Sequence, residues 1–178
     1  MAAAIEPMIT ATAELDELFR AQHARVLKAA YRITGSMSDA EDVAQNVFLR
    51  IVQRGACRSA IANPDSYVYR AAINGALDLI RRRQRENAVP DGEVEQLADG
   101  RSTERAAQAR EAVEALRGSL AQLSTRAAEM FVLRYVEERE IGEIARLMET
   151  SRAVVAVTLH RARARLRQEL ASHKRGTL

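Results

Sequence analysis

The segment from Ile141 to Leu170 places the strongest constraint on what this chain can fold into. It reads IGEIARLM, then ETS, then RAVVAVTLHRARARLRQEL. The first part predicts a short apolar helix, and the polar triplet breaks it. The last part predicts a second helix with an apolar stripe at helical spacing, formed by Val155, Leu159, Ala162 and Leu166. This pattern is typical of a helix-turn-helix, whose second helix enters a DNA groove while its cations meet phosphates. It indicates a nucleic-acid partner.

The charges are segregated along the chain, although the net charge is only +3. From Arg152 to the end, Glu169 is the single acid among many arginines, whereas residues 86–114 are biased towards acids. Local asymmetry of this kind matters more for nucleic-acid binding than the total charge. The absence of Trp and the scarcity of aromatic residues favour thin helical cores over one large core.

Helical periodicity continues upstream of this segment. Residues 1–12 are expected to form an irregular arm before a helix that runs from Glu14 to Gly35, the residue type usual just past a helix C-terminus. Ser38 and Glu41 form a candidate capping box for a helix over 39–53. A further helix is predicted over 65–85, where Pro64 suits the first turn and Asn63 the cap.

The stretch 87–103 contains Pro90, Gly92 and Gly100 among acids and lacks periodicity, which predicts a flexible acidic linker. Helical patterning returns at Glu104, and Ser124 is expected to cap a helix that ends near Tyr135. The fold class is therefore all-α. We expect two small helical domains, 13–86 and 104–172, joined by the linker 87–103, with the helix-turn-helix at the C-terminal end.

Several functional classes find no support in the residues. Cys57 is the only cysteine, and the three histidines lie far apart in sequence, so no disulfide or metal site is expected. No P-loop or nucleophile–base pairing indicates an enzyme, a catalytic residue or a cofactor. No apolar run is long enough to span a membrane, and the N-terminus lacks the pattern of a secretory signal. We therefore expect a cytoplasmic protein without membrane insertion.

Three stretches carry a more specific signal: AYRITGSMSDAEDVAQNVFLRIV, PDSYVYRAAINGALDLIRRRQRE and LSTRAAEMFVLRYVEEREIGEIARLMETSRAVVAVTLHRARARL. In this order they resemble regions 2.1–2.2, 2.3–2.4 and 4 of the extracytoplasmic function group of bacterial sigma factors. The resemblance covers the chain apart from the linker and both tips. It implies a subunit that binds the RNA polymerase core, brings its two domains to the −10 and −35 elements of promoter DNA, and helps to open the duplex. It also implies an anti-sigma factor as a partner.

The resemblance assigns two sets of residues in the first domain. The surface that binds the polymerase core comprises Asp39, Glu41, Asp42, Gln45, Asn46 and Phe48, and an acidic rim around apolar contacts suits a basic partner. The −10 DNA-binding set comprises Arg70, Asn74, Asp78, Arg81 and Arg82. Simpler interpretations remain open, because charged helix faces are often merely solvated and terminal arginines often only complement the helix dipole.

The −35 DNA-binding set implied by the resemblance comprises Arg152, Val157, Thr158, His160, Arg161, Arg163 and Arg165. The family often has polar or basic residues at Ala156, Val157 and Thr158, so fewer hydrogen bonds to base edges are expected here. Methyl groups of Val157 and Thr158 suit thymine methyls, and recognition is expected to depend partly on DNA shape. Glu149 stands where the turn often has Gly, and it requires a strained backbone.

Two other functions are compatible with a helix-turn-helix. One is a repressor or activator that binds a palindromic site as a dimer, and the other is a helical adaptor that binds only protein. The acidic surface and the second arginine-rich helix argue against the repressor. In the family, the loop before Asn63 shapes a pocket for an unstacked −10 base, but the sequence does not identify the residue that reads it. For Cys57 in that loop, an inert small side chain is favoured over a redox sensor.

Overall fold

The computed structural model describes residues 5–53, 63–87 and 104–176, and in these ranges every regular element is a helix. The helices are α1 (Ile5–Thr34), α2 (Met37–Gln53), α3 (Pro64–Asn87), α4 (Glu104–Ala121), α5 (Thr125–Tyr135), α6 (Ile141–Leu147) and α7 (Arg152–Gly176). The predicted all-α class is confirmed. The loop that contains Cys57 and nearly all of the predicted linker lie outside the described residues. None of the helices in the described ranges has the length and apolarity needed to cross a membrane.

Helix α1 begins at Ile5, so the predicted irregular arm and the start at Glu14 were wrong. The residues between these positions include several good helix formers and no glycine, and they extend the helix without a break. Pro7 lies in the first turn, where a backbone N–H has no partner within the helix in any case. The other end was predicted correctly, because Gly35 follows the helix with a φ of 72°.

The start of α2 differs from its predicted cap. The Ser36 hydroxyl oxygen accepts a hydrogen bond from the Asp39 backbone N–H at 3.3 Å, so Ser36 caps the helix and Ser38 lies inside it. The two predicted caps downstream are confirmed. The Asn63 side-chain oxygen accepts from the Ser66 N–H at 3.0 Å, and Ser124 accepts from an N–H in the first turn of α5.

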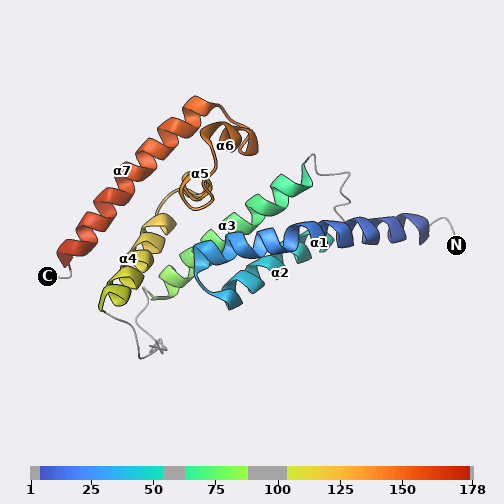
Figure 1. The fold of residues 1–178 in the computed structure, drawn as a ribbon, viewed down its shortest axis with the longest axis horizontal. Helices are drawn as coiled ribbons and strands as arrows, with labels where there is room; N and C mark the ends of the chain where they lie inside the picture. The colour runs from blue at the N-terminus through green and yellow to red at the C-terminus, as the bar shows by residue number, and fades with distance from the viewer. Residues whose placement is uncertain (1–4, 54–62, 88–103, 177–178) are drawn as a thin grey trace.

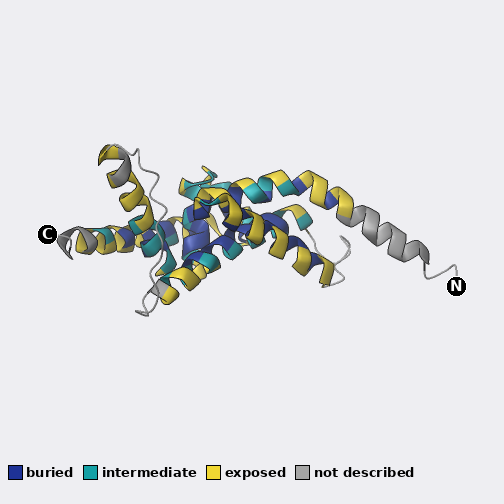
Figure 2. Cartoon of the chain, turned by 90° about the horizontal axis from the view of Figure 1, so that it is seen from below, coloured by how far each residue is buried: buried dark blue, intermediate teal, exposed yellow. Residues whose placement is uncertain are grey.

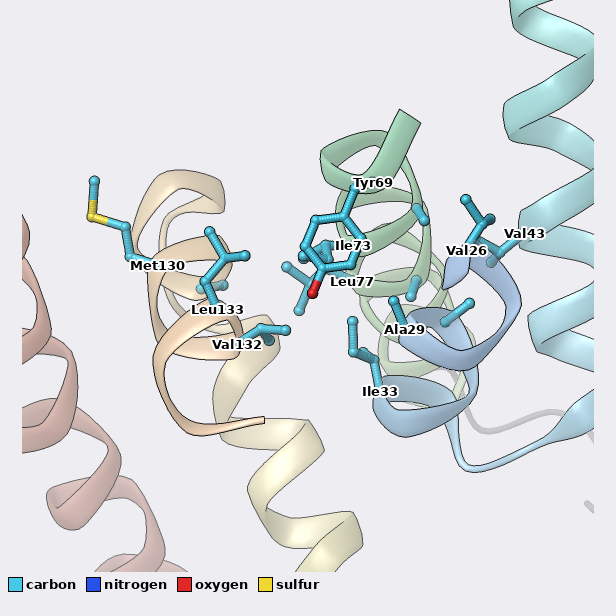
Figure 3. Close-up of a cluster of buried hydrophobic side chains, with 14 of the residues drawn as sticks. Val26, Ala29, Ile33, Val43, Tyr69, Ile73, Leu77, Met130, Val132 and Leu133 are labelled. Carbon is cyan, nitrogen blue, oxygen red and sulfur yellow. The ribbon is translucent and has the colours of Figure 1, made fainter. Parts of the chain in front are cut away.

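Helix α3 occupies the centre of the fold (Figure 1). It packs against α1 and α2 on one side and against α4 and α5 on the other. Figure 3 shows Tyr69, Ile73 and Leu77 of α3 between side chains of α1 and side chains of α5, among them Leu133. Buried residues gather at this centre, and exposed ones follow the outer faces of the surrounding helices (Figure 2). The N-terminal half (α1–α3) and the C-terminal half (α4–α7) therefore share one continuous core, which the sequence did not predict.

Helices α6 and α7 form the predicted helix-turn-helix, and α5 precedes it. The turn between α6 and α7 contains Glu149 with a φ of 49°, the left-handed conformation expected from its position. The Ser151 hydroxyl oxygen then accepts a hydrogen bond from the Val154 N–H at 3.2 Å and caps α7. All four residues of the predicted apolar stripe are buried, at 5% exposure or less. The burial of that stripe decides which side chains of α7 face outward.

Candidate nucleic-acid interface

The outer face of α7 is basic along most of its length. His160, Arg161, Arg163 and Arg165 are exposed. Within the described ranges, none of these three arginines has an acidic partner, and Arg163 makes only a 3.5 Å contact with the Tyr135 hydroxyl. Charges that are solvated and unpaired remain available to phosphates.

The first turns of the same helix are apolar on their outer side. Val157 is 50% exposed and Thr158 is half-buried. The structure adds Val154, which is 45% exposed and precedes Val157 by three residues, so both lie on one face. Val154 was not predicted as a site residue, although this spacing is present in the sequence. Arg152 is exposed, and its guanidinium packs over Gly142 of α6.

On α2, Glu41, Asp42, Gln45 and Asn46 are exposed, as a protein-docking surface requires. The Asn46 side-chain N–H donates to the Asp42 backbone oxygen at 2.8 Å, so the amide is partly used within its own helix. Leu49, 46% exposed, lies three residues after Asn46 and provides an apolar contact that the sequence interpretation did not include.

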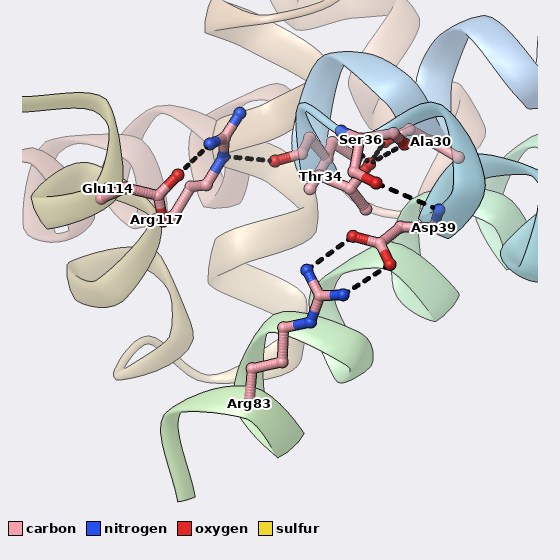
Figure 4. Close-up of polar contacts among 8 residues, drawn as sticks. Ala30, Thr34, Ser36, Asp39, Arg83, Glu114 and Arg117 are labelled. Atoms are coloured by element: carbon pink, nitrogen blue, oxygen red, sulfur yellow. Dashed lines mark hydrogen bonds and ion pairs between the residues drawn. The ribbon is translucent and has the colours of Figure 1, made fainter. Parts of the chain in front are cut away.

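The structure places two other predicted members of this surface inside the molecule. The Asp39 carboxylate accepts two hydrogen bonds of 2.6 Å from the Arg83 guanidinium and ties α2 to α3 (Figure 4). Phe48 is 6% exposed and packs edge-on against Phe19 of α1, with ring centroids 4.7 Å apart. Phe19 itself is 42% exposed and presents aromatic surface at this position instead.

The predicted −10 residues divide into covered and exposed positions on α3. Arg70 pairs with Glu129 of α5 at 2.7 Å and donates to the Leu147 backbone oxygen at 3.1 Å. Asn74 is half-buried, and its side-chain oxygen has no hydrogen-bond partner in the described part of the chain. Arg81 donates to backbone oxygens at the end of α4 and pairs with Asp78 at 2.9 Å.

The exposed end of α3 borders an open groove of about 810 Å³ between α2, α3 and the start of α5. Arg82 lies in this groove and is 64% exposed. Arg50 of α2 and Arg85 of α3 also line it, together with Asp42 and Asp78. Neither Arg50 nor Arg85 was predicted as a site residue, because they are brought together only by the packing of α2 on α3. The arginines give this groove a surface suited to phosphates.

Beside Arg70, a polar cluster of Tyr69, Arg32 and Glu137 joins the N-terminal half to the C-terminal half. The Tyr69 hydroxyl donates to Glu137 at 2.5 Å, and Arg32 of α1 pairs with the same carboxylate at 3.3 Å. Burial raises the pKa of Tyr69, and the Glu137 carboxylate raises it further, so the phenol keeps its proton and acts as the donor. The Arg25 guanidinium lies over the Tyr69 ring, 4.1 Å from its centroid.

Comparison with known proteins gives two matches in separate parts of the chain. Residues 18–86 match the family Sigma-70 region 2, and residues 113–166 match Sigma-70, region 4. The chain is 31% identical to an RNA polymerase sigma-E factor of Streptomyces avermitilis over 89% of this chain and 86% of that protein. It is 29% identical to the ECF RNA polymerase sigma factor SigE of Mycolicibacterium smegmatis over 91% of this chain, and it spans 63% of that relative's length.

A solved structure is also similar: the sigma factor RpoE in complex with the anti-sigma factor NepR from Bartonella quintana. It has a TM-score of 0.48 and 16% sequence identity, and the match covers 88% of this chain and 96% of that one. The two region matches, and the sequence identity to the Streptomyces protein over most of both chains, show the family of this chain. The chain belongs to the extracytoplasmic function group of the sigma-70 family.

Proposed function

We propose that this chain is a sigma factor that binds the RNA polymerase core and directs promoter recognition and transcription initiation. The single observation that carries the proposal is the presence of both region 2 and region 4 in one chain. A dimeric repressor needs only the helix-turn-helix, so that function would not explain the presence of region 2. The chemistry of RNA synthesis belongs to the polymerase, and an anti-sigma factor is the partner expected to restrain this protein.

The docking surface for the polymerase core is the exposed acid-and-amide face of α2: Glu41, Asp42, Gln45 and Asn46. Charged and amide groups around apolar contacts such as Leu49 give orientation and fast association with a basic partner. Asp39 and Phe48 act beneath this surface, because their side chains are buried and hold α2 against its neighbours.

The −35 element is read by the outer face of α7. Arg161, Arg163 and Arg165 meet phosphates and set the position, while Val157 and Thr158 meet base edges. Val157 cannot make hydrogen bonds and Thr158 has a single hydroxyl, so discrimination between bases depends mainly on thymine methyls and on DNA shape. The −10 element is assigned to α3, with Arg70, Asn74, Asp78, Arg81 and Arg82 as the contacting residues.

In-vitro transcription with purified polymerase core on a genomic promoter library tests the proposal. The wild-type chain is expected to produce transcripts from defined start points. Asp42→Arg is expected to reduce initiation and to weaken core binding, because it reverses the charge of the docking surface. Glu111→Arg is the matched control, since it makes the same charge change at an exposed position of α4. Absence of any defined start point with the wild-type chain would refute the proposal.

A further inference from the structure

The first two turns of α7 present an apolar patch to solvent. Val154 and Val157 are each about half exposed, and Ala153 and Ala156 beside them are exposed as well. The fully buried Val155 fixes the rotation of the helix, so these four side chains stay on the outside. In Figure 1, this end of α7 lies at the outer edge of the molecule beside α6. A contiguous apolar surface in such a position is a candidate contact surface for a partner.

Few hydrogen-bonding groups surround this patch. The Ser151 hydroxyl oxygen accepts the Val154 N–H at 3.2 Å, and the Arg152 guanidinium packs over Gly142 of α6. Thr158 is half-buried and has a single hydroxyl. The patch therefore discriminates between ligands mainly by the groups that fill the space next to its methyl groups, because those contacts depend on shape rather than on donors and acceptors.

The charges that follow the patch along α7 indicate which occupant it fits. Arg161, Arg163 and Arg165 are exposed, and in the described ranges none of them has an acidic partner. An apolar protein surface would leave these cations without a counterpart. A DNA duplex offers phosphates along the edges of its major groove, and inside the groove the C5-methyl group of thymine is the apolar feature. The occupant with matching charge and shape is therefore DNA that carries methyl groups in its major groove.

The spacing of the two valines suits two such methyl groups. Residues three apart on a helix have Cβ atoms roughly 5–6 Å from each other. Successive bases of one strand are separated by about 3.4 Å along the duplex axis. Val154 and Val157 therefore meet different base pairs, and neighbouring pairs lie within reach of both side chains.

We propose that Val154 and Val157 read 5-methylpyrimidines in neighbouring base pairs of the −35 element, so that 5-methylcytosine is accepted in place of thymine and uracil is not. A valine cannot distinguish the O4 oxygen of thymine from the N4 amine of cytosine, but it gains contact with a C5-methyl group on either base. Methylation of cytosine at C5 in this element thus strengthens binding. The inference rests on the proposed function, because it deepens the assignment of α7 to the −35 element.

The test uses the full chain with the polymerase core on a promoter obtained from the transcription library. Thymines of the −35 element are replaced by uracil one at a time, and the affinity of the complex is measured by fluorescence anisotropy. Loss of one methyl group is expected to weaken binding roughly fourfold at two neighbouring base pairs. At these two pairs, 5-methylcytosine is expected to bind roughly fourfold more tightly than cytosine for each methyl group. The same replacements between the −35 and −10 elements are the control and should leave the affinity unchanged.

Val154→Ala combined with Val157→Ala tests whether the patch is responsible for the discrimination. The change removes the contacts and keeps good helix formers, and circular dichroism verifies the helical content. The double variant should bind the thymine and uracil forms equally, and the cytosine and 5-methylcytosine forms equally. Val113→Ala is the matched control, because it makes the same change at an exposed valine of α4, and it should retain the wild-type discrimination. Equal affinity of the wild type for the thymine and uracil forms, or discrimination that persists in the double variant, would overturn the proposal.

Measurements without DNA test the other occupants of the patch. Sedimentation is recorded for the wild type and the double variant, alone and with the polymerase core. If the double variant loses affinity for the core, or if it is a monomer where the wild type is a dimer, the patch is a protein interface and the reading of methyl groups is refuted.

Initiation on the unmodified promoter distinguishes failure of this inference from failure of the proposed function. If the wild type initiates at a defined start point but does not distinguish thymine from uracil, only the reading of methyl groups is refuted. If it initiates at no defined start point, the proposed function fails, and the inference that depends on it fails with it.

Discussion

The ion pair between Asp39 and Arg83 provides a sharp test of how the N-terminal half is held together. The Asp39 side chain is 8% exposed, whereas the Arg83 side chain is 54% exposed. Removal of either partner breaks the same two hydrogen bonds of 2.6 Å. The consequences differ, because one substitution leaves a buried charge behind and the other leaves a charge that water can reach.

Arg83→Ala leaves the Asp39 carboxylate buried without its cation. Breaking a buried pair in this way typically costs about 3–5 kcal/mol, and we expect the lower end, about 3 kcal/mol, because the Arg83 side of the pair is open to solvent. Asp39→Asn removes the charge and keeps one oxygen acceptor, while Arg83 can turn towards solvent. That substitution is expected to cost about 1 kcal/mol, the usual net worth of a hydrogen bond.

Urea denaturation followed by circular dichroism measures both free energies of unfolding. Arg82→Ala is the control, because Arg82 is 64% exposed and its contact with Glu86 is 3.6 Å long. It is expected to change stability by less than about 0.5 kcal/mol. A cost for Asp39→Asn equal to or greater than that for Arg83→Ala would refute the reasoning. Core-polymerase affinity measured on folded Asp39→Asn is expected to match the wild type, since this carboxylate does not face outward.

Three further outcomes are expected. Leu133→Ala should lower the free energy of unfolding by about 3 kcal/mol, because the side chain is fully buried between α5 and α3 and leaves a cavity; a thermal denaturation showing a loss below about 1 kcal/mol would contradict this packing. Gly35→Ala should destabilise the fold by more than about 1 kcal/mol in the same assay, since its φ is 72°, a conformation that strains any residue with a Cβ. Arg163→Ala should reduce the slope of log K against log salt for duplex binding by the amount that corresponds to about one phosphate contact. An unchanged slope would show that Arg163 does not belong to the DNA surface.

Helix caps and turns were mostly predicted correctly, because these features depend on residues that are neighbours in sequence. The caps at Asn63 and Ser124, the glycine after α1 and the strained turn at Glu149 all follow from residue type and spacing. The cap of α2 was predicted at the wrong one of two nearby serines. Ser36 and Ser38 are equally good caps by type, and the structure shows that Ser36 accepts the hydrogen bond from the Asp39 N–H.

The sequence predicted the chemical type of the candidate site residues, but it did not predict which of their side chains are accessible. Asp39 and Asp42 have the same chemistry and lie on one helix, yet the former is buried against α3 and the latter is exposed. Similarly, Arg70 is held by Glu129 while Arg82 faces solvent. Which of two like side chains is buried depends on contacts between residues that are distant in sequence.

The sequence by itself determined the helices, the apolar stripe of α7 and the order of the two sigma regions, because helical period and capping act over a few residues. Only the tertiary structure decided that α4 and α5 pack on α3 and that Glu129 neutralises Arg70. That contact joins residues 59 positions apart across a segment without periodicity. Its free energy comes from burying apolar surface and pairing charge between elements, which no local pattern records.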